Sequence, residues 1–150
     1  MEKNYRVTTF VMDSGERYCM VVDRASGLPM YYPTLFLTTQ IRNKGNAFST
    51  TLAAANNLVL LLRFLESRDI NLEERLLTKD FFKPHEMDDL RDFAQRKQGR
   101  MPSKALSNPW LDDELANIVD NGTQHSRLTT FANYLRWYAM HLLKMPELDV

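Results

Sequence analysis

The side chains best suited to chemistry in this sequence are basic and neutral polar groups gathered in segments that lack acids. Residues 38–63, 94–111 and 121–145 carry ten Lys or Arg residues between them and no Asp or Glu. Cations neutralise phosphates, and hydroxyl and amide groups hydrogen-bond to phosphates without repelling them. These segments therefore favour contact with a phosphate backbone, although an ordinary solvated helix surface would have the same composition.

Charge is segregated along the chain rather than absent. The formal net charge is zero, with 19 basic and 19 acidic residues, and residues 69–92 alone hold eight acids against four bases. A balanced total argues against a non-specific nucleic-acid coat protein, but it allows a basic surface and an acidic surface on one molecule.

No pattern in the sequence is typical of catalysis or of metal binding. The three histidines, His85, His125 and His141, are isolated from one another, and none has metal-ligand spacing to a Cys or a carboxylate. Cys19 lies inside a predicted strand and is expected to be a small core residue. The five glycines are scattered, so no phosphate-binding loop is predicted. We expect no catalytic residue, no cofactor and no metal ion, and hence no self-contained enzyme.

The N-terminal elements are predicted to be a β-hairpin and a short helix. Residues 5–12 and 17–24 are rich in Val, Tyr, Thr and Phe, and they flank the turn sequence Asp13-Ser14-Gly15-Glu16. Residues 30–37 are expected to be extended, because Pro33 disfavours a helix there. A short helix should follow at about 38–43 and end at Gly45, with Ser49 or Thr50 capping the next helix.

The rest of the chain is predicted to be helical. Apolar residues recur at intervals of three and four in most of it, with loop composition at 99–109 and a helix-stopping proline at position 146. The apolar stripe of the last helix is Leu128, Phe131, Leu135, Tyr138 and Leu142. The predicted helices are 51–68, 84–97, 111–119 and 124–144.

These elements define a mainly α fold with a small β-hairpin (α+β). At 150 residues the chain suits one domain with a small appendage. We expect residues 1–30 to form the hairpin appendage and residues 31–150 a bundle of four to five helices. The longest apolar run has five residues and no signal peptide is predicted, so we expect no membrane contact and a cytoplasmic location, which a single cysteine also suits.

Two stretches together resemble one protein family. The first begins at Gly27-Leu28-Pro29 and continues with Pro33, Leu37-Thr38, Ile41-Arg42, Gly45 and Thr50-Thr51. The second is Arg127-Leu128 and Tyr134-Leu135-Arg136-Trp137 in the last helix. Their order is similar to that in the N-terminal half of bacterial tyrosine recombinases, the phage-integrase-like site-specific recombinases. In that family a SAM-like helical core-binding domain precedes a separate catalytic domain. The resemblance covers about residues 27–145.

The resemblance implies DNA integration and recombination as the biological setting, in a bacterial cytoplasm. The core-binding domain clamps duplex DNA at the recombination site, and the chemistry is carried by the catalytic domain. That domain's recognisable His-x-x-Arg motif is missing here, because Asp88, Leu128 and Lys144 stand three residues after the three histidines. The catalytic domain is therefore expected to be absent from this chain. We expect the full-length protein to oligomerise on DNA and this chain alone to be monomeric.

Two polar edges are the candidate DNA-binding residues under this resemblance. Helix N-termini favour phosphates through their free N–H groups, so each edge includes the start of a helix, where a hydroxyl could alternatively serve only as a cap. Arg127, near the start of the last helix, is the candidate for reading a base. The full set is Arg42, Lys44, Asn46, Ser49, Thr50, Thr51, Thr123, Gln124, His125, Arg127, Thr130 and Asn133.

A second function class also fits the sequence. The acidic stretch 69–92 could be the contact face of a helical protein-interaction module with no role in DNA binding. The two hypotheses differ in their response to salt. Phosphate contacts make affinity fall steeply with ionic strength, whereas an apolar protein interface changes little.

Overall fold

The computed structural model describes residues 5–96 and 118–148. It is mainly helical, with one two-stranded antiparallel sheet, as the sequence predicts. The expected loop at 99–109 lies outside the described residues, as does most of the expected helix at 111–119. The end of that helix is described, and there Ile118 forms an isolated β-bridge with Arg96 instead.

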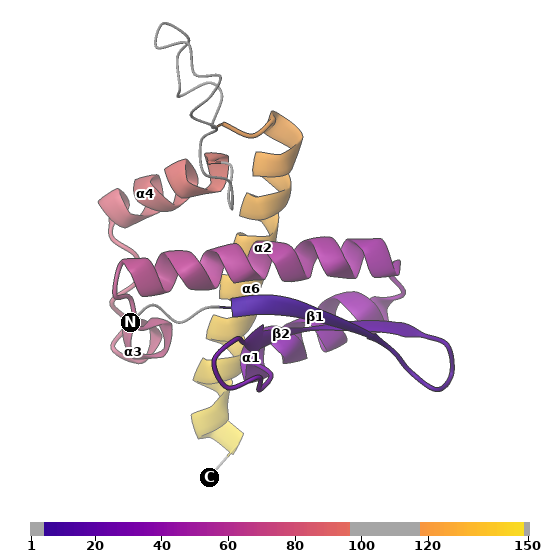
Figure 1. Cartoon of the computed structure of the whole chain (residues 1–150). Coiled ribbons are helices and arrows are strands. Elements are labelled where there is room, and N and C mark those ends of the chain that lie inside the picture. The colour runs from indigo at the N-terminus through magenta and orange to yellow at the C-terminus, as the bar shows by residue number, and fades with distance from the viewer. Residues whose placement is uncertain (1–4, 97–117, 149–150) are drawn as a thin grey trace, which may run out of the picture.

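The hairpin consists of β1 (Tyr5–Val11) and β2 (Arg17–Asp23), and it confirms the predicted strands and turn. Thr9 is paired with Cys19, and Gly15 has a φ of 84°, the left-handed conformation that favours glycine. The hairpin lies alongside the central helix in Figure 1. Tyr5, Cys19 and Val21 of the hairpin belong to the same hydrophobic cluster as the buried residues of the helices, so the hairpin shares the core of the helical part.

Residues 31–44 form one continuous helical stretch, where the sequence predicted an extended segment and a shorter helix. It comprises α1 (Tyr31–Phe36), the π-helical η1 (Leu37–Ile41) and the 3₁₀ segment η2 (Arg42–Lys44). Pro33 is the third residue of α1, in the first turn, where a backbone N–H has no partner within the helix. The proline is therefore tolerated. Gly45, with a φ of 84°, ends the stretch as predicted.

The central helix α2 (Phe48–Ser67) forms the middle of the core. Ten of its twenty residues are buried, including Leu58, Leu61 and Phe64, which are completely covered. Its length and hydropathy would also suit a membrane-spanning helix, but more than half of its apolar stretch is buried inside the fold. Burial in the core accounts for the apolar composition of α2.

Two helices, α3 and α4, lie between α2 and residue 96, and the sequence predicted one of them. The missed helix is the short α3 (Leu72–Leu77), which begins where the side chain of Asn71 accepts a hydrogen bond from the Glu74 N–H. The predicted one is α4 (Pro84–Gln95), which starts at its proline as expected.

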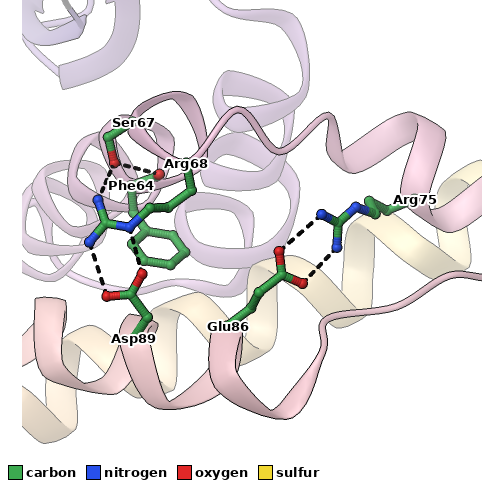
Figure 2. A network of polar contacts seen from close by, with 6 residues as sticks. All are labelled: Phe64, Ser67, Arg68, Arg75, Glu86 and Asp89. Atoms are coloured by element: carbon green, nitrogen blue, oxygen red, sulfur yellow. Dashed lines mark hydrogen bonds and ion pairs between the residues drawn. The ribbon is translucent and has the colours of Figure 1, made fainter.

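Two bidentate ion pairs hold α4 against the elements before it (Figure 2). Arg75 of α3 reaches both carboxylate oxygens of Glu86, at 2.7 and 2.9 Å. Arg68, at the end of α2, does the same with Asp89 at 2.5 and 3.0 Å, and its guanidinium also lies 5.0 Å from the centre of the Phe64 ring. Part of the acidic segment is therefore used inside the fold.

The last helix, α6 (Asn121–Leu148), crosses behind α2 in Figure 1 and contacts α1, α2, α3 and α4. It starts three residues earlier than predicted and, contrary to the prediction, continues past Pro146, since a proline within a helix removes a backbone hydrogen bond without always ending the helix. Its buried face also differs from the predicted stripe, because Tyr134 is buried while Leu128 and Leu135 are half-buried at its flanks. The buried residues of α6 are Phe131, Tyr134, Tyr138 and Leu142.

Candidate nucleic-acid interface

A groove of about 600 Å³ lies between the helical stretch 31–44 and α6. Its basic and polar groups include Lys44 from η2 and Asn133, Arg136 and His141 from α6, and none of its described lining residues is an acid. The lining residues are Phe36, Gln40, Ile41, Lys44, Thr130, Asn133, Arg136, Trp137, Met140 and His141.

A second hollow of about 470 Å³ extends this groove toward the start of α2. It is lined by Ser49 and Thr50 from α2 and by His125 from α6, and none of its described lining residues is an acid. Ile41 and Thr130 line both this hollow and the groove. The two hollows therefore form one continuous surface, here called the polar groove. It joins the two edges that the sequence predicted separately.

Six of the twelve predicted residues line the polar groove. They are Lys44, Ser49, Thr50, His125, Thr130 and Asn133. Sequence reasoning missed Gln40, Arg136 and His141. Asn133, Arg136 and Met140 follow one another at intervals of three and four, so helical spacing from Asn133 could have identified Arg136.

A buried amide fixes the floor of the polar groove. Asn57 of α2 is 8% exposed, and its Nδ2 donates to the Thr130 hydroxyl at 3.0 Å and to the Ser126 hydroxyl at 3.2 Å. The Thr130 hydroxyl in turn donates to the backbone oxygen of Ser126 at 3.0 Å. Thr130 thus holds α2 and α6 together, and its hydroxyl is already engaged.

Aromatic side chains form one wall of the polar groove. Trp137 stacks on His141 with ring centres 5.2 Å apart and an interplanar angle of 20°. Phe36 meets Trp137 edge-on at 5.5 Å, and Tyr32 meets His141 edge-on at 5.8 Å. This packing fixes the position of the His141 ring on the groove wall.

Three predicted residues of the first edge have structural partners. Arg42 pairs with Glu16 of the hairpin at 2.6 Å, and its guanidinium lies 4.8 Å from the centre of the Tyr18 ring. Asn46 donates to the backbone oxygen of Ile41 at 2.9 Å, which closes the end of the stretch 31–44. Thr51 is buried, with its hydroxyl directed to the backbone oxygen of Ala47. These three side chains serve the fold.

Arg127 also has structural partners rather than a free guanidinium. Its Nη1 donates to the backbone oxygens of Ala94 and Arg96 at 3.0 and 2.7 Å, at the end of α4. Helix ends leave carbonyl oxygens without partners, and a cation satisfies them well. Burial lowers the pKa of the Arg127 guanidinium from its ordinary value.

The start of α6 is capped by a carboxylate. The Thr123 N–H donates to the Asp120 side chain at 2.7 Å, and the Gln124 N–H donates to the Asp120 backbone oxygen at 3.1 Å. Hydrogen bonds from the side chain and the backbone N–H of Thr123 to the Asp120 carboxylate lower the pKa of Asp120 below its usual value. A negative charge therefore already occupies the position where the sequence suggested a phosphate, and Thr123 and Gln124 do not line the polar groove.

The start of α2 has the opposite character. Its N-cap residue is Ala47, which offers no side-chain cap, and its first turn contains no acid. Ser49 and Thr50 lie one and two residues inside the helix and are exposed, so they do not cap it. Exposed hydroxyls beside an uncapped helix N-terminus suit an anion better than the start of α6 does.

The described residues contain no cluster of three His, Cys, Asp or Glu side chains that could hold a metal ion. Cys19 is 2% exposed on β2, and burial raises the pKa of its thiol. It is the core residue that the sequence predicted.

Searches against protein-family models, curated proteins and solved structures find no significant match to this chain. The resemblance to tyrosine recombinases therefore rests on the sequence motifs alone.

Proposed function

We propose that this chain binds duplex DNA through the polar groove, as the N-terminal DNA-binding region of a tyrosine-type site-specific recombinase. The observation that carries the DNA-binding proposal is the continuous acid-free surface shared by η2, the start of α2 and α6. The recombinase assignment rests on the sequence motifs alone.

The groove offers each kind of group that duplex recognition requires. Lys44 supplies a point charge for a phosphate, and Ser49 and Thr50 supply hydroxyl donors beside the start of α2. Asn133 and Arg136 are exposed on the same part of α6. An amide can pair with adenine and a guanidinium with guanine in the major groove, so these two residues are the proposed base readers.

Salt-dependent binding tests this proposal. The chain is titrated against a fluorescent duplex of about 30 base pairs while salt rises from roughly 50 to 200 mM. Each phosphate contact contributes about −0.9 to the slope of log affinity against log salt. The double variant Lys44→Ala/Arg136→Ala should bind more weakly and have a slope reduced by about two, or by about one if Arg136 contacts only a base.

Arg91→Ala is the control for the loss of a single positive charge, because Arg91 is exposed on α4 and pairs with Asp88 outside the polar groove. It should leave both affinity and slope nearly unchanged. Absence of duplex binding at low salt, or affinity that does not depend on salt, would contradict the proposal. Cleavage of DNA or a covalent adduct from this chain alone would contradict the absence of a catalytic domain.

A further inference from the structure

A further pocket, of about 580 Å³ and separate from the polar groove, lies where α1, α6 and the end of α2 meet. Five of the six tyrosines of the chain line it, together with three carboxylates, and no Lys, Arg or His stands among its described lining residues. It is called the tyrosine pocket here. Its charge is the reverse of that of the polar groove, so a nucleic acid does not suit it.

The tyrosine rings stand at steep angles around this space. Tyr31 and Tyr32 have ring centres 5.0 Å apart and an interplanar angle of 84°, and Tyr32 and Tyr138 are 4.8 Å apart at 75°. Tyr134 lies 5.8 Å from Tyr138 at 39°. Aromatic faces turned in several directions around one space attract organic cations through the negative charge on each face.

The carboxylates add negative charge at the edge of the same pocket. Asp69 and Glu73 are exposed, and neither forms an ion pair with another residue in the described part of the chain. Burial, together with the charge of Glu73, raises the pKa of Tyr138 to about 12, so its hydroxyl stays neutral. The pocket therefore places tyrosine rings beside carboxylate side chains.

The neighbouring arginines do not neutralise these acids. Arg68 and Arg75, which are close in sequence to Asp69 and Glu73, point toward Asp89 and Glu86 of α4 (Figure 2). Both arginines are therefore paired with carboxylates of α4. A ligand that supplied a cation at Asp69 and Glu73 would complete the charge balance.

We infer that the tyrosine pocket binds a lysine or arginine side chain from a peptide segment of a partner protein. Leu62, Leu65 and Ile70 line the pocket with apolar surface that fits the aliphatic stem of such a side chain, while its charged head meets Asp69 and Glu73. The pocket and the polar groove have no lining residue in common, so we expect that a partner protein and DNA can be bound together.

Two matched peptides test this inference with the whole chain. One is a fluorescein-labelled nonapeptide with two arginines separated by glycines, and the other carries neutral, isosteric citrulline at both positions. The arginine peptide should bind and the citrulline peptide should not. Asp69→Asn/Glu73→Gln should weaken the arginine peptide by about tenfold or more. The control Asp80→Asn/Asp92→Asn removes the same charge outside the pocket and should change affinity less than about twofold.

A ring variant separates a built pocket from general attraction to acids. Tyr31 is 67% exposed, so Tyr31→Ala should leave the fold intact and still weaken the arginine peptide several-fold. Equal binding of the two peptides, equal loss in the two double variants, or no effect of Tyr31→Ala would overturn the inference. Free arginine amide binding as tightly as the peptide would overturn the assignment to a protein partner.

The outcome is independent of the proposed DNA function. Asp69→Asn/Glu73→Gln should keep its affinity for duplex DNA, and Lys44→Ala/Arg136→Ala should keep its affinity for the arginine peptide.

Discussion

The Nη1 atom of Arg127 lies 3.0 Å from the backbone oxygen of Ala94, so a cation on α6 closes the end of α4. The same atom reaches the backbone oxygen of Arg96 at 2.7 Å. The sequence suggested that Arg127 reads a DNA base from the outer face of its helix. In the structure the guanidinium satisfies carbonyl groups that a helix end leaves without partners.

Arg127→Ala should therefore destabilise the fold. Removing the donor leaves two carbonyl oxygens without it, and we expect the free energy of unfolding to fall by about 1–3 kcal/mol. Urea unfolding followed by circular dichroism measures this. Arg136→Ala, an exposed arginine on the same helix, should stay within about 0.5 kcal/mol of the unmodified chain. Equal stability of the two variants would show that the Arg127 hydrogen bonds contribute nothing.

Lys44 and Arg136 should differ in how they affect sequence preference. Lys44→Ala removes a phosphate contact and should weaken cognate and scrambled duplexes alike. Arg136→Ala should weaken the cognate duplex more, by about 1–3 kcal/mol if the guanidinium reads guanine. Anisotropy titrations of both variants with both duplexes measure the difference. A uniform loss with Arg136→Ala would place that side chain on phosphate.

Asn57 and Thr130 should be energetically coupled, because their hydrogen bond of 3.0 Å joins α2 to α6. Asn57→Ala should cost about 1–3 kcal/mol, since Asn57 is buried and its partners on α6 would lose a donor. Combined with Thr130→Val in a double-mutant cycle, the coupling energy should exceed about 0.5 kcal/mol. Strictly additive losses would mean that the two side chains act independently.

The ion pair between Arg75 and Glu86 should make stability depend on pH in acid. Hydrogen bonds from Arg75 and from the Lys83 N–H lower the pKa of Glu86 from its usual 4.5 to about 2. The unfolded chain then binds this proton more readily than the folded chain. The contribution is complete above pH 4.5 and is lost as pH falls toward 2.

Glu86→Gln should therefore be less stable than the unmodified chain at pH 7, by about 1 kcal/mol. The difference should shrink between pH 4.5 and pH 2, as thermal unfolding across that range would reveal. A constant difference at every pH would mean that the amide substitution perturbs packing rather than charge.

Cys19 should react slowly with thiol reagents. The side chain lies on β2 and is buried in the shared core, and burial raises its pKa, so both access and the thiolate fraction are low. Reaction with an aromatic disulfide reagent should be much faster in denaturant than in buffer. Rapid reaction in buffer would show that the hairpin opens easily from the helices.

Periodicity predicted the main elements of the fold, and local chemistry explains what it missed. The hairpin, α2 and α4 have strong alternation or helical spacing next to good turn or cap residues. Pro33 predicts an extended segment at 31–36, but this segment is helical, because a proline in the first helical turn costs no hydrogen bond. The six-residue α3 is too short to have a clear period.

The candidate site was only partly predictable, because residue type does not reveal a side chain's partners. Arg42 and Arg127 look like free cations in the sequence, yet one meets Glu16 of the hairpin and the other meets the end of α4. Both partners are more than twenty residues away in the chain. Arg136 was overlooked because its position beside the stretch 31–44 follows from the docking of two distant helices.

The place of α6 in the chain also sets the order in which the protein can fold during synthesis. Asn57 and Thr130 are separated by 73 residues, and Tyr134 and Trp137, which pack against Phe36, are synthesised long after it. Until residues up to Leu142 have left the ribosome, the part of α2 that contacts α6 stays uncovered. We therefore expect nascent chains to hold this apolar surface exposed until α6 has been synthesised and to depend on chaperones until then, with compaction as an abrupt event once α6 can dock.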